Sequence, residues 1–166
     1  MPVLATVRNT GTHTAHHLLR HFKLHFLTED IQADRRLWFG HAETENLPRF
    51  AEKRAVDGPM ILTMRHPLLV ADSWRRRGRK VGEDFKAMWR NLFSLQGEDT
   101  YWLPIDTPDR DRRLEALSTR LGVDLDDDWP VHGHYEGDLG ANGMDHAELV
   151  EFCQTLPFGQ FYGDIR

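Results

Sequence analysis

Short apolar runs alternate with longer amphipathic segments along most of this chain. The runs span residues 3–7, 36–42, 58–64 and 100–105. Each has the length of one strand and the continuous apolar character of a strand that is buried on both faces. Strands that alternate with helices predict a parallel sheet covered by helices on both sides. We therefore expect an α/β fold, a three-layer αβα architecture with a mostly parallel sheet.

The segments between these runs show helical spacing and recognisable helix ends. We predict helices over 14–26, 67–78, 82–96, 108–122 and 144–155, with a partly helical connection over 45–55. Pro67 and Pro108 suit the first helical turn, where a missing N–H costs nothing, and Gly122 suits a C-terminal cap. Apolar residues at helical spacing, such as Leu114, Leu117 and Leu121, are expected to face the core.

Length and composition set the class of protein. With 166 residues, the chain can bury one real core, so we expect one domain over 1–166, with the aromatic- and Gly-rich tail 129–166 packed on it. A net charge of −5 gives no reason to expect nucleic acid or a membrane as partner. The single cysteine, Cys153, excludes an internal disulfide and suits a reducing compartment. No apolar run reaches the ~20 residues of a membrane span, and the N-terminal run is too short for a signal peptide, so we expect a cytoplasmic protein.

The stretch VRNTGTHT, residues 7–14, follows the first predicted strand and opens the first predicted helix. In parallel α/β folds, ligands bind beyond the carboxyl ends of strands, often at this first turn. Gly11 lets the backbone approach an anion closely, and Thr10, Thr12 and Thr14 offer hydroxyl donors beside the helix N-terminus. The Walker signature is absent, because there is one glycine and no lysine. The stretch predicts either an anion cradle or an ordinary turn with a threonine N-cap.

A second motif follows the third predicted strand. Arg65 ends that strand, and Ser73 lies eight residues further on, two turns into the next predicted helix. An arginine at a strand end and a serine on the adjoining helix can converge on one phosphate, which the guanidinium binds with paired charge-assisted hydrogen bonds.

In this order, V-R-x-x-G-T followed by R-x-P-x5-S resembles the sulfotransferases that use 3′-phosphoadenylyl sulfate (PAPS), over roughly residues 3–122. The first loop is most similar to that of heparan-sulfate-type members. The resemblance implies a P-loop-type fold in which Arg65 and Ser73 hold the 3′-phosphate. It also implies that the first loop holds the phosphosulfate through Asn9, Thr10, Gly11, Thr12, His13 and Thr14.

This sequence departs from the family pattern at the catalytic lysine, which falls at Asn9. The lysine offsets charge on the leaving oxygen, a task that a neutral amide performs poorly. Arg8 and His13 are the nearest cationic substitutes, and the alternative is a protein that binds nucleotide without efficient transfer. The later Arg-Lys-Gly segment of the family is not evident. Arg75, Arg76 and Arg77 either compensate for it or form a solvated basic face.

The acceptor hydroxyl needs a general base, which the family places near the end of the second strand. In the stretch FGHAETE, His41 is the first candidate for this base and Glu43 is the second. The alternative for His41 is a strand-end histidine bonded to the backbone.

Other residues with chemical potential have simpler explanations. His13, His17, His21 and His25 recur every four residues, but successive pairs rotate around the predicted helix, so a solvated face is favoured over a metal site. Four tryptophans at strand or helix positions are expected in the core, namely Trp38, Trp74, Trp89 and Trp102. Trp74 and Trp89 could instead line an adenine pocket.

The expected function is transfer of a sulfuryl group from PAPS to a hydroxyl of a small molecule or glycan, without a metal. Two alternatives remain open. One is a small kinase that uses ATP and Mg²⁺, and the other is a degenerate relative that binds nucleotide or a partner without catalysis.

Overall fold

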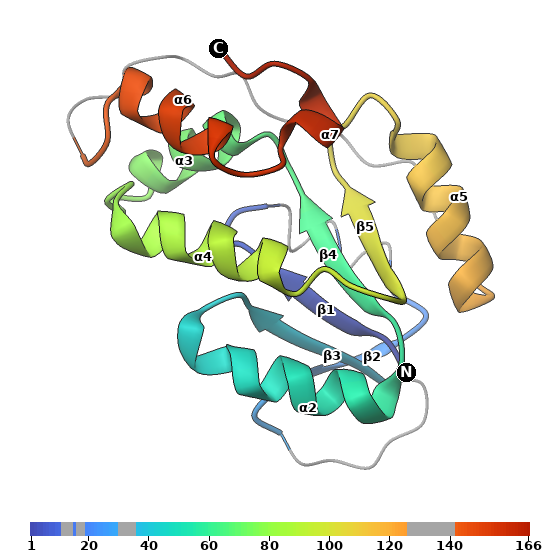
Figure 1. Ribbon diagram of the computed structural model, residues 1–166. Coiled ribbons are helices and arrows are strands. Elements are labelled where there is room, and N and C mark those ends of the chain that lie inside the picture. The colour runs from blue at the N-terminus through green and yellow to red at the C-terminus, as the bar shows by residue number, and fades with distance from the viewer. Residues whose placement is uncertain (11–14, 16–18, 30–35, 126–141) are drawn as a thin grey trace.

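Five parallel strands form one sheet in the part of the chain that the computed structural model describes, residues 1–10, 15, 19–29, 36–125 and 142–166. The order across the sheet is β2-β3-β1-β4-β5 (Figure 1). The strands are β1 (Val3–Thr6), β2 (Lys23–Phe26), β3 (Arg36–His41), β4 (Met60–Met64) and β5 (Thr100–Pro104). Each neighbouring pair is parallel, as the alternation of apolar runs and helical segments predicts.

After residue 43, the helices are η1 (Thr44–Asn46), α2 (Leu47–Asp57), α3 (Pro67–Arg76), α4 (Glu83–Ser94), α5 (Arg110–Leu121), α6 (His146–Gln154) and α7 (Gly159–Tyr162). Of these, α3, α4, α5 and α6 follow the sequence signals closely, and α7 was not predicted. Pro67 occupies the first turn of α3, and Gly122 caps α5 at φ 65°. The start of α5 differs from the prediction by two residues, because the helix begins at Arg110, with Asp109 as its N-cap, rather than at Pro108.

The predicted helix over 14–26 is wrong in its last part, where the chain forms the edge strand β2. Lys23 to Phe26 pair with Arg36 to Phe39 of β3, and the Phe26 ring lies 5.8 Å from that of Phe39. Apolar residues at 22, 24 and 26 fit a short strand as well as a helix, and pairing with β3 decides between them. His25 therefore lies on a strand, with Nδ1 3.0 Å from a Glu29 carboxylate oxygen, and not on a helical face of histidines.

Alternating residues of the strands face opposite sides and build two separate clusters. Val3, Met60 and Leu62 belong to the larger cluster, which includes buried residues of α2, α3, α4 and α6. Leu4, Ile61 and Leu103 belong to the other cluster, together with Leu114 and Leu117 of α5. The sheet is thus covered on both faces, and the three-layer αβα arrangement is confirmed.

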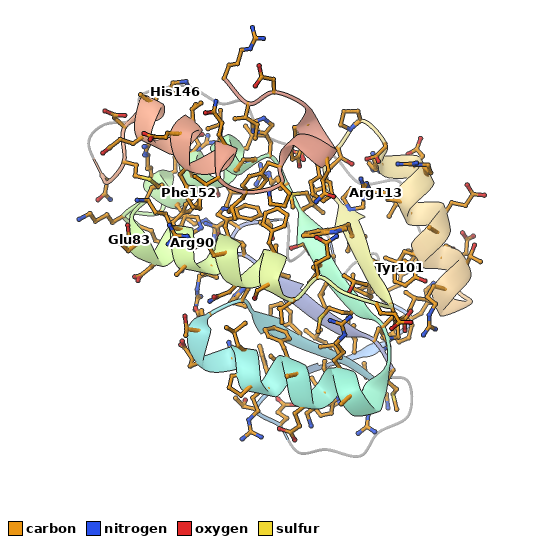
Figure 2. All side chains as sticks on the ribbon, viewed as in Figure 1. Glu83, Arg90, Tyr101, Arg113, His146 and Phe152 are labelled. Carbon is orange, nitrogen blue, oxygen red and sulfur yellow. The ribbon has the colours of Figure 1, made fainter. Side chains whose placement is uncertain are left out.

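The tail helices α6 and α7 complete the larger cluster. Phe152 of α6 points toward α4, where Arg90 lies 5.6 Å from its ring centroid (Figure 2). Phe161 of α7 lies 4.9 Å from Trp102 of β5. Cys153 is buried, and burial raises the pKa of its thiol to about 12. The tail packs on the side of the sheet that carries α3 and α4, so it belongs to the same core.

The four tryptophans predicted for the core are buried, with Trp74 and Trp102 only 4% and 6% exposed. No helix in the described ranges is both long and apolar enough to cross a membrane.

Candidate functional site

The carboxyl ends of β1, β3 and β4 meet at one edge of the sheet. β1 lies between β3 and β4, so the chain changes sides of β1 when it passes from β3 to β4. Such a switch point opens a crevice in which α/β proteins bind ligands. The segments that follow these strands carry Arg8 and Asn9 after β1, Glu43 after β3, and Arg65 after β4.

The loop after β1 turns sharply at Asn9, which has a left-handed φ of 67°. Asparagine tolerates this conformation better than most residues. Thr10 follows and is fully buried, and its hydroxyl donates to the Val7 carbonyl at 2.7 Å and lies 2.6 Å from the Thr63 hydroxyl. The Thr10 hydroxyl is thus engaged within the protein and anchors the loop to β4, whereas we expected it to face an anion. Gly11, Thr12, His13 and Thr14 lie outside the described residues.

Arg65 joins the two sequence motifs. Its Nη1 donates to the Asn9 carbonyl at 3.1 Å, so the arginine at the end of β4 contacts the loop after β1. Burial lowers the pKa of the Arg65 guanidinium, and the Asp106 carboxylate opposes this shift. Ser73 lies in the second half of α3 and is half-buried.

Arg8 and Glu43 form an ion pair across the ends of β1 and β3. The Arg8 Nε donates to Glu43 Oε1 at 2.7 Å, and Arg8 Nη2 donates to the same oxygen. Both side chains remain partly exposed, at 34% and 25%. Trp74 Nε1 donates to the Arg8 carbonyl at 2.8 Å, which fixes the backbone beneath the pair. Two residues predicted for separate catalytic tasks are therefore in direct contact.

His41 lies at the end of β3, beside β1. Its Nδ1 is 2.9 Å from the Thr6 hydroxyl, and its ring meets Phe39 edge-on at 5.3 Å. These contacts hold the His41 ring at the strand end through a side chain, the Thr6 hydroxyl. His41 does not line the cleft described next, whereas Glu43 does.

A cleft of about 460 Å³ opens beside the Arg8–Glu43 pair, between η1 and the α3–α4 region. This volume lies in the range of small-molecule sites. Trp74 and Met88 supply apolar surface, and charges of both signs surround it. The lining residues are Arg8, Glu43, Thr44, Glu45, Trp74, Arg79, Lys80, Asp84, Ala87, Met88 and Asn91.

Sequence reasoning did not find this cleft. Its walls come from several separate segments, and the sequence singled out Arg8, Glu43 and Trp74 for unrelated roles rather than as parts of one cleft. Asn91 donates to the Ala42 carbonyl at 3.0 Å and to the Thr44 hydroxyl at 3.2 Å, which ties α4 to the segment after β3. No local pattern signals a wall that depends on such a long-range contact.

Asp106, just after β5, is a further polar residue that sequence reasoning missed. Its carboxylate accepts from the His66 backbone N–H at 3.0 and 3.1 Å and from the Tyr162 hydroxyl at 2.6 Å. Burial lowers the pKa of His66, and burial together with Asp106 raises the pKa of Tyr162 far above its usual value. The sequence signal that could have identified Asp106 is its position just after a predicted strand. Within the described ranges, no group of three or more His, Cys, Asp or Glu side chains is arranged to hold a metal ion.

No match to this chain was found among protein-family models, curated proteins or solved structures.

Proposed function

We propose that this protein binds PAPS at the carboxyl edge of the sheet and transfers its sulfuryl group to a hydroxyl of an acceptor held in the cleft. The observation that carries the proposal is the hydrogen bond from Arg65 to the Asn9 carbonyl. It brings together two motifs that lie more than fifty residues apart and that resemble the donor site of the PAPS-dependent sulfotransferases only as a pair.

The donor side of the site offers groups that suit an anionic nucleotide. Arg65 keeps a positive charge in a half-buried position, where a phosphate gains more from it than on an open surface. The Asn9 amide nitrogen is buried and has no hydrogen-bond partner within the described residues. An orphaned buried donor costs about 1–3 kcal/mol, and an oxygen of a bound phosphosulfate would satisfy it.

The acceptor side offers a base and a compensating cation. Attack by the acceptor oxygen on sulfur forms one S–O bond and breaks the S–O bond to the 5′-phosphate, while the hydroxyl proton must leave. In this proposal the Glu43 carboxylate takes that proton, because it lines the cleft and Arg8 orients it. Protonation of Glu43 removes the partner charge of Arg8, so the guanidinium becomes free to offset charge on the leaving oxygen. His41 is the alternative base.

Calorimetric titration with adenosine 3′,5′-bisphosphate, alongside ATP with Mg²⁺, tests the donor site. We expect dissociation constants in the micromolar range for the bisphosphate, with much weaker heat from ATP. No binding of the bisphosphate would overturn the proposal, and tight binding of ATP that requires Mg²⁺ would favour a kinase instead.

Asn9 also favours a second candidate function, nucleotide binding without efficient transfer. The Asn9 side chain is a neutral amide at the position of the expected lysine, and loss of one charge-stabilising group typically costs about 10²–10³ in rate. Incubation with PAPS and a panel of sugars and small alcohols separates the two functions. Release of the bisphosphate that depends on an acceptor supports transfer, and intact PAPS despite tight binding supports the binding protein.

A further inference from the structure

The connection between α3 and α4 brings the half-buried side chain of Arg79 to the wall of the cleft. Glu43, the half-buried carboxylate of the cleft, is paired with Arg8. Arg79 instead lies over the Trp74 ring, with its guanidinium carbon 5.7 Å from the ring centroid. The face of an aromatic ring attracts a cation but does not compensate its charge as a carboxylate does. Arg79 can therefore receive an anionic group from a molecule in the cleft.

Backbone hydrogen bonds hold this connection on both sides of the Arg79 side chain. The Arg79 N–H donates to the Trp74 carbonyl at 2.9 Å. Two residues further on, the Val81 N–H donates to the Asn142 carbonyl at 3.0 Å, and the Val81 carbonyl accepts from the Met144 N–H at 2.8 Å. The fixed backbone and the ring contact together preorganise the guanidinium, which reduces the entropy lost when it binds a ligand.

Trp74 also connects Arg79 to the side of the cleft where the proposed base lies. Its Nε1 donates to the Arg8 carbonyl at 2.8 Å, and the Arg8 side chain orients Glu43. The indole thus contacts both the Arg8 backbone and the Arg79 guanidinium. All four residues line the same cleft of about 460 Å³, which suits one small molecule. Such a molecule can place a hydroxyl at Glu43 and an anionic group at Arg79.

The other charges of the cleft favour a single negative charge on that molecule. Apart from Arg79 and the ion pair already described, the charged lining residues are exposed, and they are Lys80, Glu45 and Asp84. Two carboxylates against one ammonium group disfavour a dianion such as a phosphate monoester. A carboxylate carries one charge, and its two oxygens match the paired N–H donors of a guanidinium.

We propose that Arg79 determines the specificity of the cleft by binding a carboxylate of the acceptor, so that the acceptor is a small hydroxylated carboxylic acid. This inference rests on the proposed function, because it names the class of molecule whose hydroxyl receives the sulfuryl group. The hydroxyl oxygen attacks sulfur, its proton passes to Glu43, and adenosine 3′,5′-bisphosphate leaves. The acceptor carboxylate stays at Arg79 throughout and takes no part in the bond changes.

The test compares hydroxy acids with their primary amides, which keep the size of the acid and lose its charge. The probes are para-(hydroxymethyl)benzoate and galacturonate, each paired with the corresponding amide. Calorimetry measures the affinity of the protein for each probe, with and without adenosine 3′,5′-bisphosphate. Initial rates of bisphosphate release from PAPS measure transfer to the same probes.

The variants are Arg79→Gln, which removes the charge, and Arg79→Lys, which keeps it. Arg77→Gln is the matched control, because Arg77 is exposed past the end of α3 and is not among the residues that line the cleft. Circular dichroism shows that each variant is folded.

We expect the wild-type protein to bind the acid of at least one pair about 10- to 100-fold more tightly than its amide, the usual effect of one charge-assisted contact. Arg79→Gln should abolish this preference by weakening binding of the acid alone. Arg79→Lys should retain part of the preference, and Arg77→Gln should retain all of it. In the rates, the loss in Arg79→Gln should appear in KM for the acid and not in kcat.

Equal affinity for acid and amide in every pair would overturn the inference, and so would a preference that survives in Arg79→Gln. Both outcomes leave the proposed function standing if the bisphosphate binds and transfer is observed. If the preference depends on Arg79 but the wild-type protein neither binds the bisphosphate nor uses PAPS, the proposed function falls and the carboxylate site remains without it.

Discussion

At the scale of single residues, the contact between Arg8 and Glu43 decides how the two candidate bases are ranked. Glu43 lines the cleft and is oriented by two donors of one guanidinium, whereas the His41 ring is bound to Thr6 at the strand end. A general base must reach the proton that it removes, so position in the cleft counts before basicity. This ranking reverses the order that the sequence suggested.

We expect Glu43→Gln to reduce acceptor-dependent release of the bisphosphate from PAPS by about 10²–10⁴-fold, the usual loss of a general base. The amide keeps the size of the side chain and still accepts from Arg8, so affinity for the bisphosphate should change little. His41→Gln is the matched variant, and it should reduce the rate of acceptor-dependent release by no more than about tenfold. Initial rates of bisphosphate release measure both variants. A larger loss of rate in His41→Gln than in Glu43→Gln would assign the proton transfer to His41.

At the scale of secondary structure elements, local signals predicted most of the helices and strands, and failed where tertiary pairing decides. Pro67 and Gly122 mark helix ends through backbone properties of their own, so α3 and the end of α5 could be predicted. β2 could not be, because an exposed edge strand of four residues acquires its identity from pairing with β3. The contact of Arg65 with the first loop follows from parallel strands that end at one edge. The cleft depends on where α4 docks, which no local pattern contains.

The start of α5 carries a pH-dependent contribution to stability. Burial alone would raise the pKa of the N-cap carboxyl of Asp109, but hydrogen bonds from Arg113, Arg112 and Thr107 lower it to about 2, below the ordinary value of 3.8. The folded state thus binds this proton more weakly than the unfolded state. Its contribution is complete above the unfolded pKa and is lost as the pH falls toward about 2.

We expect Asp109→Asn to reduce the free energy of unfolding by about 1–2 kcal/mol near pH 6, and by about 1 kcal/mol less near pH 3. Urea denaturation at both pH values measures the difference. Asp111→Asn removes another carboxylate from the first turn of α5. Its effect on the free energy of unfolding should differ less between the two pH values than that of Asp109→Asn. Equal pH dependence of Asp109→Asn and the wild-type protein would contradict the assignment.

At the scale of the whole molecule, the tail connects the larger core cluster to the carboxyl edge of the sheet. Phe152, Phe158 and Phe161 are buried in that cluster. Tyr162 is the last residue of α7, and its hydroxyl donates to the Asp106 carboxylate. The Tyr162 ring also lies 4.7 Å from that of His66, the residue after Arg65. The tail is therefore part of the structure that supports the site, and its docking should be measurable as stability.

Tyr162→Phe tests this connection, because it removes a single hydroxyl and keeps the ring in place. The lost hydrogen bond to the half-buried Asp106 carboxylate should lower the free energy of unfolding by about 1.5–3 kcal/mol in urea denaturation followed by tryptophan fluorescence. Tyr101→Phe on β5, where the ring is partly exposed, should cost less than about 0.5 kcal/mol. The His66 backbone N–H still binds Asp106 in the variant, so affinity for adenosine 3′,5′-bisphosphate should fall by less than about threefold. A large loss of affinity without loss of stability would instead make Tyr162 part of the nucleotide site, whereas a loss of stability alone gives the tail a supporting role.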